Sequence, residues 1–150
     1  ALEGAALCRC NQTGAMLQTI RDYWGGMIDL GATTFWEAYD ASQKGNDHYT
    51  FYGRKFGKSL CHAWSSGPVF LLSADMFGIR PLEPGWKRFT VSPRATDLAW
   101  MSTAIPTPGG ALEVDVEGKD VRVRVPKGCT LVTGKGREFR GPGTTSTGKR

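Results

Sequence analysis

The feature that most constrains the fold is a change in hydrophobic period in the middle of the chain. In the first half, apolar residues recur at helical spacing over residues 15–30 and again over 60–77. Pro81, Pro84 and Gly85 then form a short linker, after which apolar and polar residues alternate. Helices followed by a run of strands indicate an α+β chain, with an antiparallel β-sandwich as its second part.

Both helical segments carry signals that predict their ends. Gly31 ends the first helix, while Gly25 and Gly26 inside it predict close packing against a neighbouring backbone. Ser59 is expected to cap the second helix, and Pro68 is expected to kink or interrupt it.

Five segments in the second half have the period of β-strands. In the third and fourth of them, Val114 and Val116 are expected to face inward, while Arg122 and Arg124 lie opposite acidic residues on the outer face. The turn at residues 117–120 predicts a hairpin between these two strands. The five predicted strands cover residues 86–91, 98–105, 111–116, 121–125 and 130–132.

The formal charge of +5 is confined to the second half, because residues 1–80 are balanced. Much of the excess lies in the Gly- and Thr-rich segment 134–150, which is predicted to be a disordered basic tail. The basic residues form no stripe with interleaved aromatic residues, so a nucleic-acid partner is not expected. An apolar content of 40% is typical of a globular core.

The four cysteines do not form a metal or disulfide pattern. Cys8 and Cys10 are too close for an ordinary disulfide and no CxxC occurs, so free thiols, mostly buried, are expected. No metal or other cofactor is predicted. No apolar run reaches the length of a membrane span, and the compartment stays open between cytoplasm, periplasm and exterior. The first ten residues are typical of a helix rather than of a signal peptide.

A carboxylate between aromatic residues is the strongest chemical signal. Glu37 follows Trp36 shortly after the turn at Gly31, where the chain is expected to reach a surface rim. Aromatic walls bind the apolar faces of sugars and lower the local dielectric, which suits a carboxylate to acid–base work. An alternative stays open, because Thr34 and Glu37 also have the spacing of a helix capping box.

A set of motifs in order resembles the bacterial α-L-rhamnosidases, glycoside hydrolases of the six-hairpin (α/α)6-barrel class. The motifs are YWGGMIDLGATTFWEAYD at 23–40, SLCHAW at 59–64, FGIRPLEPGWKRFTVSPR at 77–94 and the TPGG turn at 107–110. Together they span roughly residues 1–133. The resemblance implies that residues 1–80 are the last helices of an incomplete barrel and that 81–133 form a C-terminal β-sandwich.

The resemblance also implies roles for individual residues. Glu37 corresponds to the general base of an inverting hydrolase, and His62 to a histidine that contacts the bound sugar. Trp36 and Trp64 are candidate sugar-facing walls, although each also fits a core position. The family's general acid lies earlier in the barrel, and nothing in residues 1–36 matches it. Cys61 departs from the family, which often has a small polar residue there.

The expected protein is therefore the C-terminal part of a longer hydrolase that acts on rhamnose-containing glycosides. By itself it is predicted to be inactive, and its uncovered helices in residues 1–80 are predicted to self-associate. Two alternatives stay open. The first is a non-catalytic carbohydrate-binding or structural β-sandwich module, and the second is an α/α-barrel hydrolase of another sugar.

Overall fold

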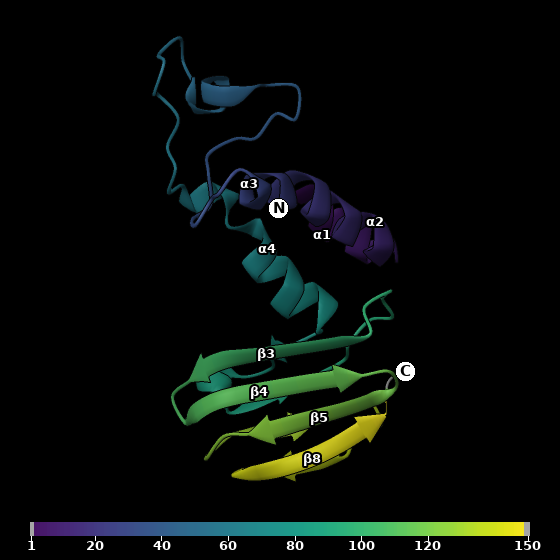
Figure 1. Cartoon of the computed structure of the whole chain (residues 1–150). Helices are drawn as coiled ribbons and strands as arrows, with labels where there is room; N and C mark the ends of the chain where they lie inside the picture. The colour runs from purple at the N-terminus through teal and green to yellow at the C-terminus, as the bar shows by residue number, and fades with distance from the viewer. Residues whose placement is uncertain (1, 149–150) are drawn as a thin grey trace. The chain divides into compact units, whose positions relative to one another are not determined.

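The computed structural model describes residues 2–148, which divide into two compact units, Ala1–Leu71 and Leu72–Arg150 (Figure 1). We call them the helical unit and the β unit. The first is built from helices and irregular segments and the second mainly from strands, which confirms the predicted α+β class. No helix in the described part of the chain is both long and apolar enough to cross a membrane.

The helical unit begins with two consecutive helices joined by a short turn. Helix α1 spans Leu2–Arg9, and α2 spans Thr13–Ile20. The helical path continues through the π-helical turn Arg21–Gly25 into α3, Gly26–Asp29, and ends at Gly31, whose positive φ of 85° suits glycine. The predicted first helix is thereby confirmed, and Met16, Leu17 and Met27 are its buried positions.

Residues 30–66 contain no α-helix and only short 3-10 turns, at Gly45–Tyr49 and Ala63–Ser65. The predicted second helix therefore begins late: α4 spans Gly67–Phe70 and continues into a π-helical stretch, Leu71–Met76. Pro68 lies in the first turn of α4, where its missing N–H costs nothing, so it begins the helix instead of kinking it. The prediction that Ser59 caps this helix was wrong.

The β unit contains two four-stranded sheets. One has the order β1-β2-β6-β7, from Arg80–Pro81, Arg88–Thr90, Thr130–Val132 and Glu138–Arg140, with a 3-10 turn at Pro84–Trp86 between its first two strands. The other has the order β3-β4-β5-β8, from Trp100–Thr107, Gly110–Glu117, Asp120–Val125 and Gly143–Gly148 (Figure 1). The pairings are antiparallel except for β2 with β6, which is parallel and departs from the predicted all-antiparallel sandwich.

The hairpin of β4 and β5 follows the predicted register. Val114 lies opposite Val123 in the core, while Glu113 lies opposite Arg124 on the outer face. The Arg124 guanidinium contacts the Glu113 carboxylate at 3.2 Å, so the predicted cross-strand charge pair is present. Such an exposed pair stabilises by at most about 1 kcal/mol, and burial of the valines therefore dominates.

The prediction of a disordered tail over residues 134–150 was wrong for the part that the structure describes. Strands β7 and β8 lie in this segment, and β8 pairs along the whole length of β5, from Asp120 to Val125. Two physical reasons account for the difference. Its threonines are β-branched and favour extended backbone, and β5 would otherwise leave an unpaired edge. Residues 149 and 150 lie outside the described residues.

Candidate active site

Two segments that are far apart in the sequence are hydrogen-bonded side by side in the helical unit. The Glu37 N–H donates to the carbonyl of Ser59 at 2.8 Å, and the His62 N–H donates to the carbonyl of Phe35 at 2.7 Å. The backbone at 35–37 therefore pairs with the backbone at 59–62. This pairing explains why residues 59–62 are not helical, and it brings the positions of Glu37 and His62 together.

The Glu37 carboxylate is half-buried and accepts hydrogen bonds at both oxygens. The Tyr52 hydroxyl donates to Oε1 at 3.1 Å, and the Ser59 N–H donates to Oε2 at 3.1 Å. The capping-box alternative was wrong, because no helix begins here and the Thr34 hydroxyl instead donates to the carbonyl of Leu60. Glu37 is thus held by partners outside its own turn.

Charge and burial around Glu37 change the behaviour of two neighbours. The hydrogen bond and negative charge of Glu37 raise the pKa of the Tyr52 phenol above its usual value. Lys58 is only 8% exposed, and burial lowers the pKa of its amine, against the opposing effects of the Asp40 and Glu37 carboxylates. Asp40 itself accepts two hydrogen bonds from Ser42, which lower its pKa. A buried amine and two carboxylates therefore share one electrostatic environment.

His62 lies in extended backbone immediately before the 3-10 turn at 63–65, rather than in the first turn of a helix as predicted. Its carbonyl accepts a hydrogen bond from the Ser65 N–H at 3.0 Å, and its side chain is half-buried. An imidazole in such a position retains a face for a polar ligand, since a neutral ring both donates and accepts. Its contact with a sugar stays a prediction.

The two candidate tryptophans lie in opposite environments. Trp36 is 4% exposed and packs against Tyr49, with ring centroids 5.6 Å apart, so its burial favours the alternative of a core residue. Trp64, in contrast, is 92% exposed. Of these two tryptophans, Trp64 is the one whose ring is open to a ligand.

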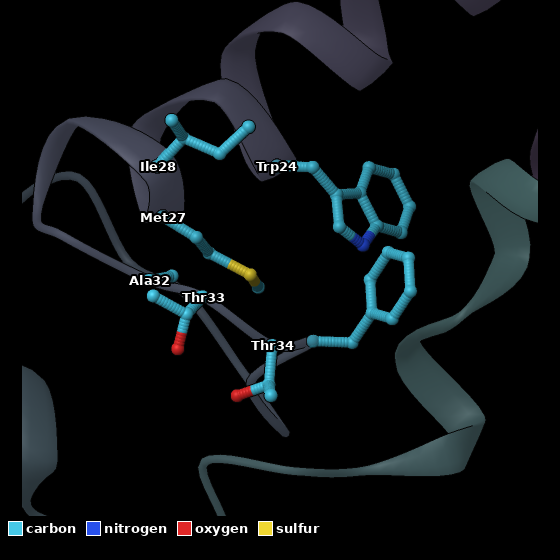
Figure 2. A pocket seen from close by; sticks show the side chains of 7 residues that line it. Trp24, Met27, Ile28, Ala32, Thr33 and Thr34 are labelled. Carbon is cyan, nitrogen blue, oxygen red and sulfur yellow. The ribbon is translucent and has the colours of Figure 1, made fainter.

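An apolar hollow of about 220 Å³ lies just before Glu37 in the chain (Figure 2). Met27 and Ile28 of α3 form one side and the segment 32–35 another, with Trp24 also lining it. The Trp24 indole N–H donates to the carbonyl of Ser65 at 2.8 Å, which joins this wall to the residue that directly follows the motif at 59–64. Typical pockets for drug-sized ligands start at about 300 Å³, so this hollow suits only a small part of a ligand.

Sequence reasoning missed part of this arrangement. Tyr52 and Lys58 lie in the segment 41–58, which has no hydrophobic period and carries none of the motifs, so no pattern predicted their place beside Glu37. Tyr52 and Gly53 form the two-residue turn of a hairpin, so the Tyr52 side chain lies at the tip of the loop. The glycine is the one sequence feature that favours such a turn. His48, in the same segment, is buried and stacks in parallel on Tyr39, so it does not face a ligand freely.

The structure also locates the cysteines and tests for metal sites. Cys8 and Cys129 are buried, Cys10 and Cys61 are exposed, and none of the four forms a disulfide. The expectation that the thiols are mostly buried therefore holds for two of them. Within residues 2–148, no three His, Cys, Asp or Glu side chains are grouped so that they could hold a metal ion.

Comparisons with known proteins now bear on this geometry. Residues 78–133 match the family described as the bacterial α-L-rhamnosidase C-terminal domain. An α-L-rhamnosidase of Alteromonas sp. (strain LOR) is 32% identical over 109 residues, which are 69% of this chain and 11% of that protein. The chain therefore spans about a tenth of the length of this curated relative.

Solved structures give a similar result. The native α-L-rhamnosidase of Aspergillus terreus superimposes over 98% of this chain and 18% of its own, with a TM-score of 0.77 and 21% identity, which shows a shared fold. A GH78-family rhamnosidase of Bacillus sp. GL1 covers 88% of this chain and 14% of its own, with a TM-score of 0.58 and 25% identity. These findings confirm the resemblance that the sequence motifs indicated.

Proposed function

We propose that this chain, which corresponds to a C-terminal part of an α-L-rhamnosidase, supplies the general base for hydrolysis of terminal α-L-rhamnosyl linkages. The reaction class rests on the names of the similar proteins. The role of Glu37 rests on one observation of geometry. Its partly exposed carboxylate is oriented at both oxygens, by Tyr52 and by Ser59, beside the segment that carries His62.

In the proposed reaction Glu37 removes a proton from a water molecule that attacks the anomeric carbon with inversion. A second carboxylic acid must protonate the leaving oxygen from the other side of the sugar, about 6.5–9.5 Å away. We propose that a barrel segment preceding this chain supplies that acid. Isolated residues 1–150 are therefore expected to be inactive.

Two further side chains have proposed roles in holding the sugar. His62 would exchange hydrogen bonds with neighbouring hydroxyl groups, which a neutral imidazole can do at its two nitrogens. The exposed Trp64 ring would stack against the apolar face of the glycoside. The buried Trp36 would support the site by packing against Tyr49.

The proposal also includes the larger architecture. Helices α1 to α4 would belong to a six-hairpin (α/α)6 barrel that precedes the β-sandwich at 81–133. The exposed positions of large apolar residues such as Ile28 and Phe70 support this, because other hairpins would then cover them.

The test uses a longer polypeptide that joins this chain to its preceding barrel segment. Replacing Glu37 with Gln removes the base without changing the size of the side chain, so we expect kcat on p-nitrophenyl α-L-rhamnoside to fall about 10²- to 10⁴-fold. Glu113→Gln, on the outer face of β4, serves as the matched control and should leave kcat unchanged. Full activity of Glu37→Gln would overturn the assignment. Release of p-nitrophenol by the isolated 150-residue chain, abolished by Glu37→Gln, would instead overturn the expectation that this chain is inactive by itself.

A further inference from the structure

The loop that delivers Tyr52 to Glu37 is a tight hairpin with an unusual tip. Phe51 and Arg54 exchange backbone hydrogen bonds of 3.0 and 2.9 Å, leaving Tyr52 and Gly53 as a two-residue turn. Both turn residues have positive φ, 50° and 71°. Turns of this kind favour Asn-Gly or Gly-Gly, because a Cβ is crowded when φ is positive. Tyrosine at the first position is therefore strained.

Several contacts hold the hairpin in this conformation. The Lys58 N–H donates to the carbonyl of Tyr49 at 3.1 Å, and the Thr50 hydroxyl donates to the carbonyl of Lys55 at 3.2 Å, so the base of the loop is closed. At Gly57, a Cβ would overlap the carbonyl of Phe51, so the returning backbone passes very close to the hairpin. The surroundings thus fix a residue whose own backbone preference is different.

We propose that Tyr52 is a positioning residue for Glu37, held in a strained turn so that its hydroxyl fixes the orientation of the base. The inference rests on the proposed function, because it assigns Tyr52 a role through the general base. Tyr52 is exposed, so packing of its side chain in a core does not explain why the strained backbone conformation is kept. Its hydroxyl bond to Oε1 and its edge contact with the Phe51 ring, at 4.3 Å between centroids, are the interactions that the turn secures.

The hydrogen bonds around Glu37 leave room for this role. An ionised carboxylate has about four lone-pair sites. The Tyr52 hydroxyl occupies one at Oε1, and the Ser59 N–H occupies one at Oε2. The two bonds fix the plane of the carboxylate, while each oxygen keeps a second lone pair with which to accept a proton from water. A base held in one plane needs less reorganisation before it accepts that proton.

The first test measures kcat and KM separately in the longer polypeptide. Tyr52→Phe removes only the hydroxyl, so we expect kcat to fall about tenfold with KM nearly unchanged, since a positioned base acts on the chemical step. Thr19→Val is the matched control, because it removes a hydroxyl bond within α2, to the carbonyl of Ala15, that neither closes this loop nor reaches Glu37. A Tyr52→Phe variant with unchanged kcat would overturn the inference while Glu37→Gln still lost activity. Activity retained in Glu37→Gln would instead overturn the proposed function.

A second variant separates the hydroxyl from the strained backbone. Asn tolerates positive φ well, so Tyr52→Asn keeps the turn, but its short side chain replaces the phenol hydroxyl that reaches Glu37, and it should lose activity as Tyr52→Phe does. Full activity in Tyr52→Asn would mean that the turn alone matters.

A third measurement does not depend on activity. Titrating the phenols of the 150-residue chain, with Tyr52→Phe to identify the signal of Tyr52, should show that Glu37→Gln lowers the pKa of Tyr52 toward 10.0. If that pKa did not move, the hydrogen bond on which the inference rests would be absent in solution.

Discussion

The helical unit and the β unit are of similar length, but they bury their large apolar side chains to different extents. In the β unit, alternating residues of both sheets fill one core, including Phe89, Leu112 and Leu131, and only Leu82 and Trp100 are large apolar side chains that are exposed among its described residues. The helical unit exposes nine such side chains within residues 2–71: Leu2, Ile28, Leu30, Tyr52, Phe56, Leu60, Trp64, Val69 and Phe70. The candidate site lies in the unit with the smaller core.

The difference shows that the well-packed core and the candidate site lie in different units. The β unit obtains its stability from its own burial, whereas the helical unit presents apolar surface and holds its polar site with backbone pairing and a few side-chain hydrogen bonds. Apolar surface of this kind is typical of an interface with further protein. The predicted self-association through residues 1–80 would bury the same side chains and stays a prediction.

The largest expected effect is a difference in the free energy of unfolding between two Phe→Ala variants, one in each unit. Phe89, the central residue of β2, is 0% exposed, so Phe89→Ala should lower the free energy of unfolding of the β unit by about 3–5 kcal/mol. Phe56 is 69% exposed, so Phe56→Ala should change stability by less than about 0.5 kcal/mol. Urea denaturation followed by circular dichroism measures both. Equal losses would show that the helical unit is as well packed as the β unit.

A smaller effect is expected at the paired glycines of the helical unit. The sequence predicted close packing of both against a neighbouring backbone, but only Gly26 is crowded, and its neighbour is the Tyr39 ring. Gly26→Ala would overlap that ring and should cost about 1–3 kcal/mol, whereas Gly25→Ala has open space and should stabilise by about 0.5–1 kcal/mol. Thermal denaturation of the two variants measures the contrast. Equal stabilisation by both would mean that Tyr39 moves aside freely, as expected of a loosely packed unit.

The same contrast explains what the sequence could predict. Val114 and Val123 alternate with charged residues, so one local pattern predicted their strands, faces and pairing. The helix at 13–29 was also predicted from a local pattern, the recurrence of apolar residues at helical spacing. Residues 59–62, in contrast, are not helical because they pair with residues 35–37, a long-range contact that no local period records. Glu37 could be identified from its motif, but its partner Tyr52 depends on how a loop without periodicity folds back.

The smallest expected effect is a difference in pH dependence that arises at Lys58. Because burial lowers the pKa of its amine below 10.5, the folded state binds fewer protons than the unfolded state just below that pH, and the free energy of unfolding should rise there as pH increases. Tyr52 acts in the opposite sense above 10.0, since its raised pKa makes the folded state hold its proton longer.

Chemical denaturation between pH 8 and 11 therefore separates the two groups with variants. Lys58→Met should remove the rise and Tyr52→Phe the fall, whereas Lys119→Met, at an exposed turn of the β unit, should alter neither. If Lys58→Met kept the pH dependence of the wild type, the amine would be solvated in solution. Lys58 would then resemble the exposed lysines among the described residues of the β unit, and the polar site would be as open to solvent as the apolar surface around it.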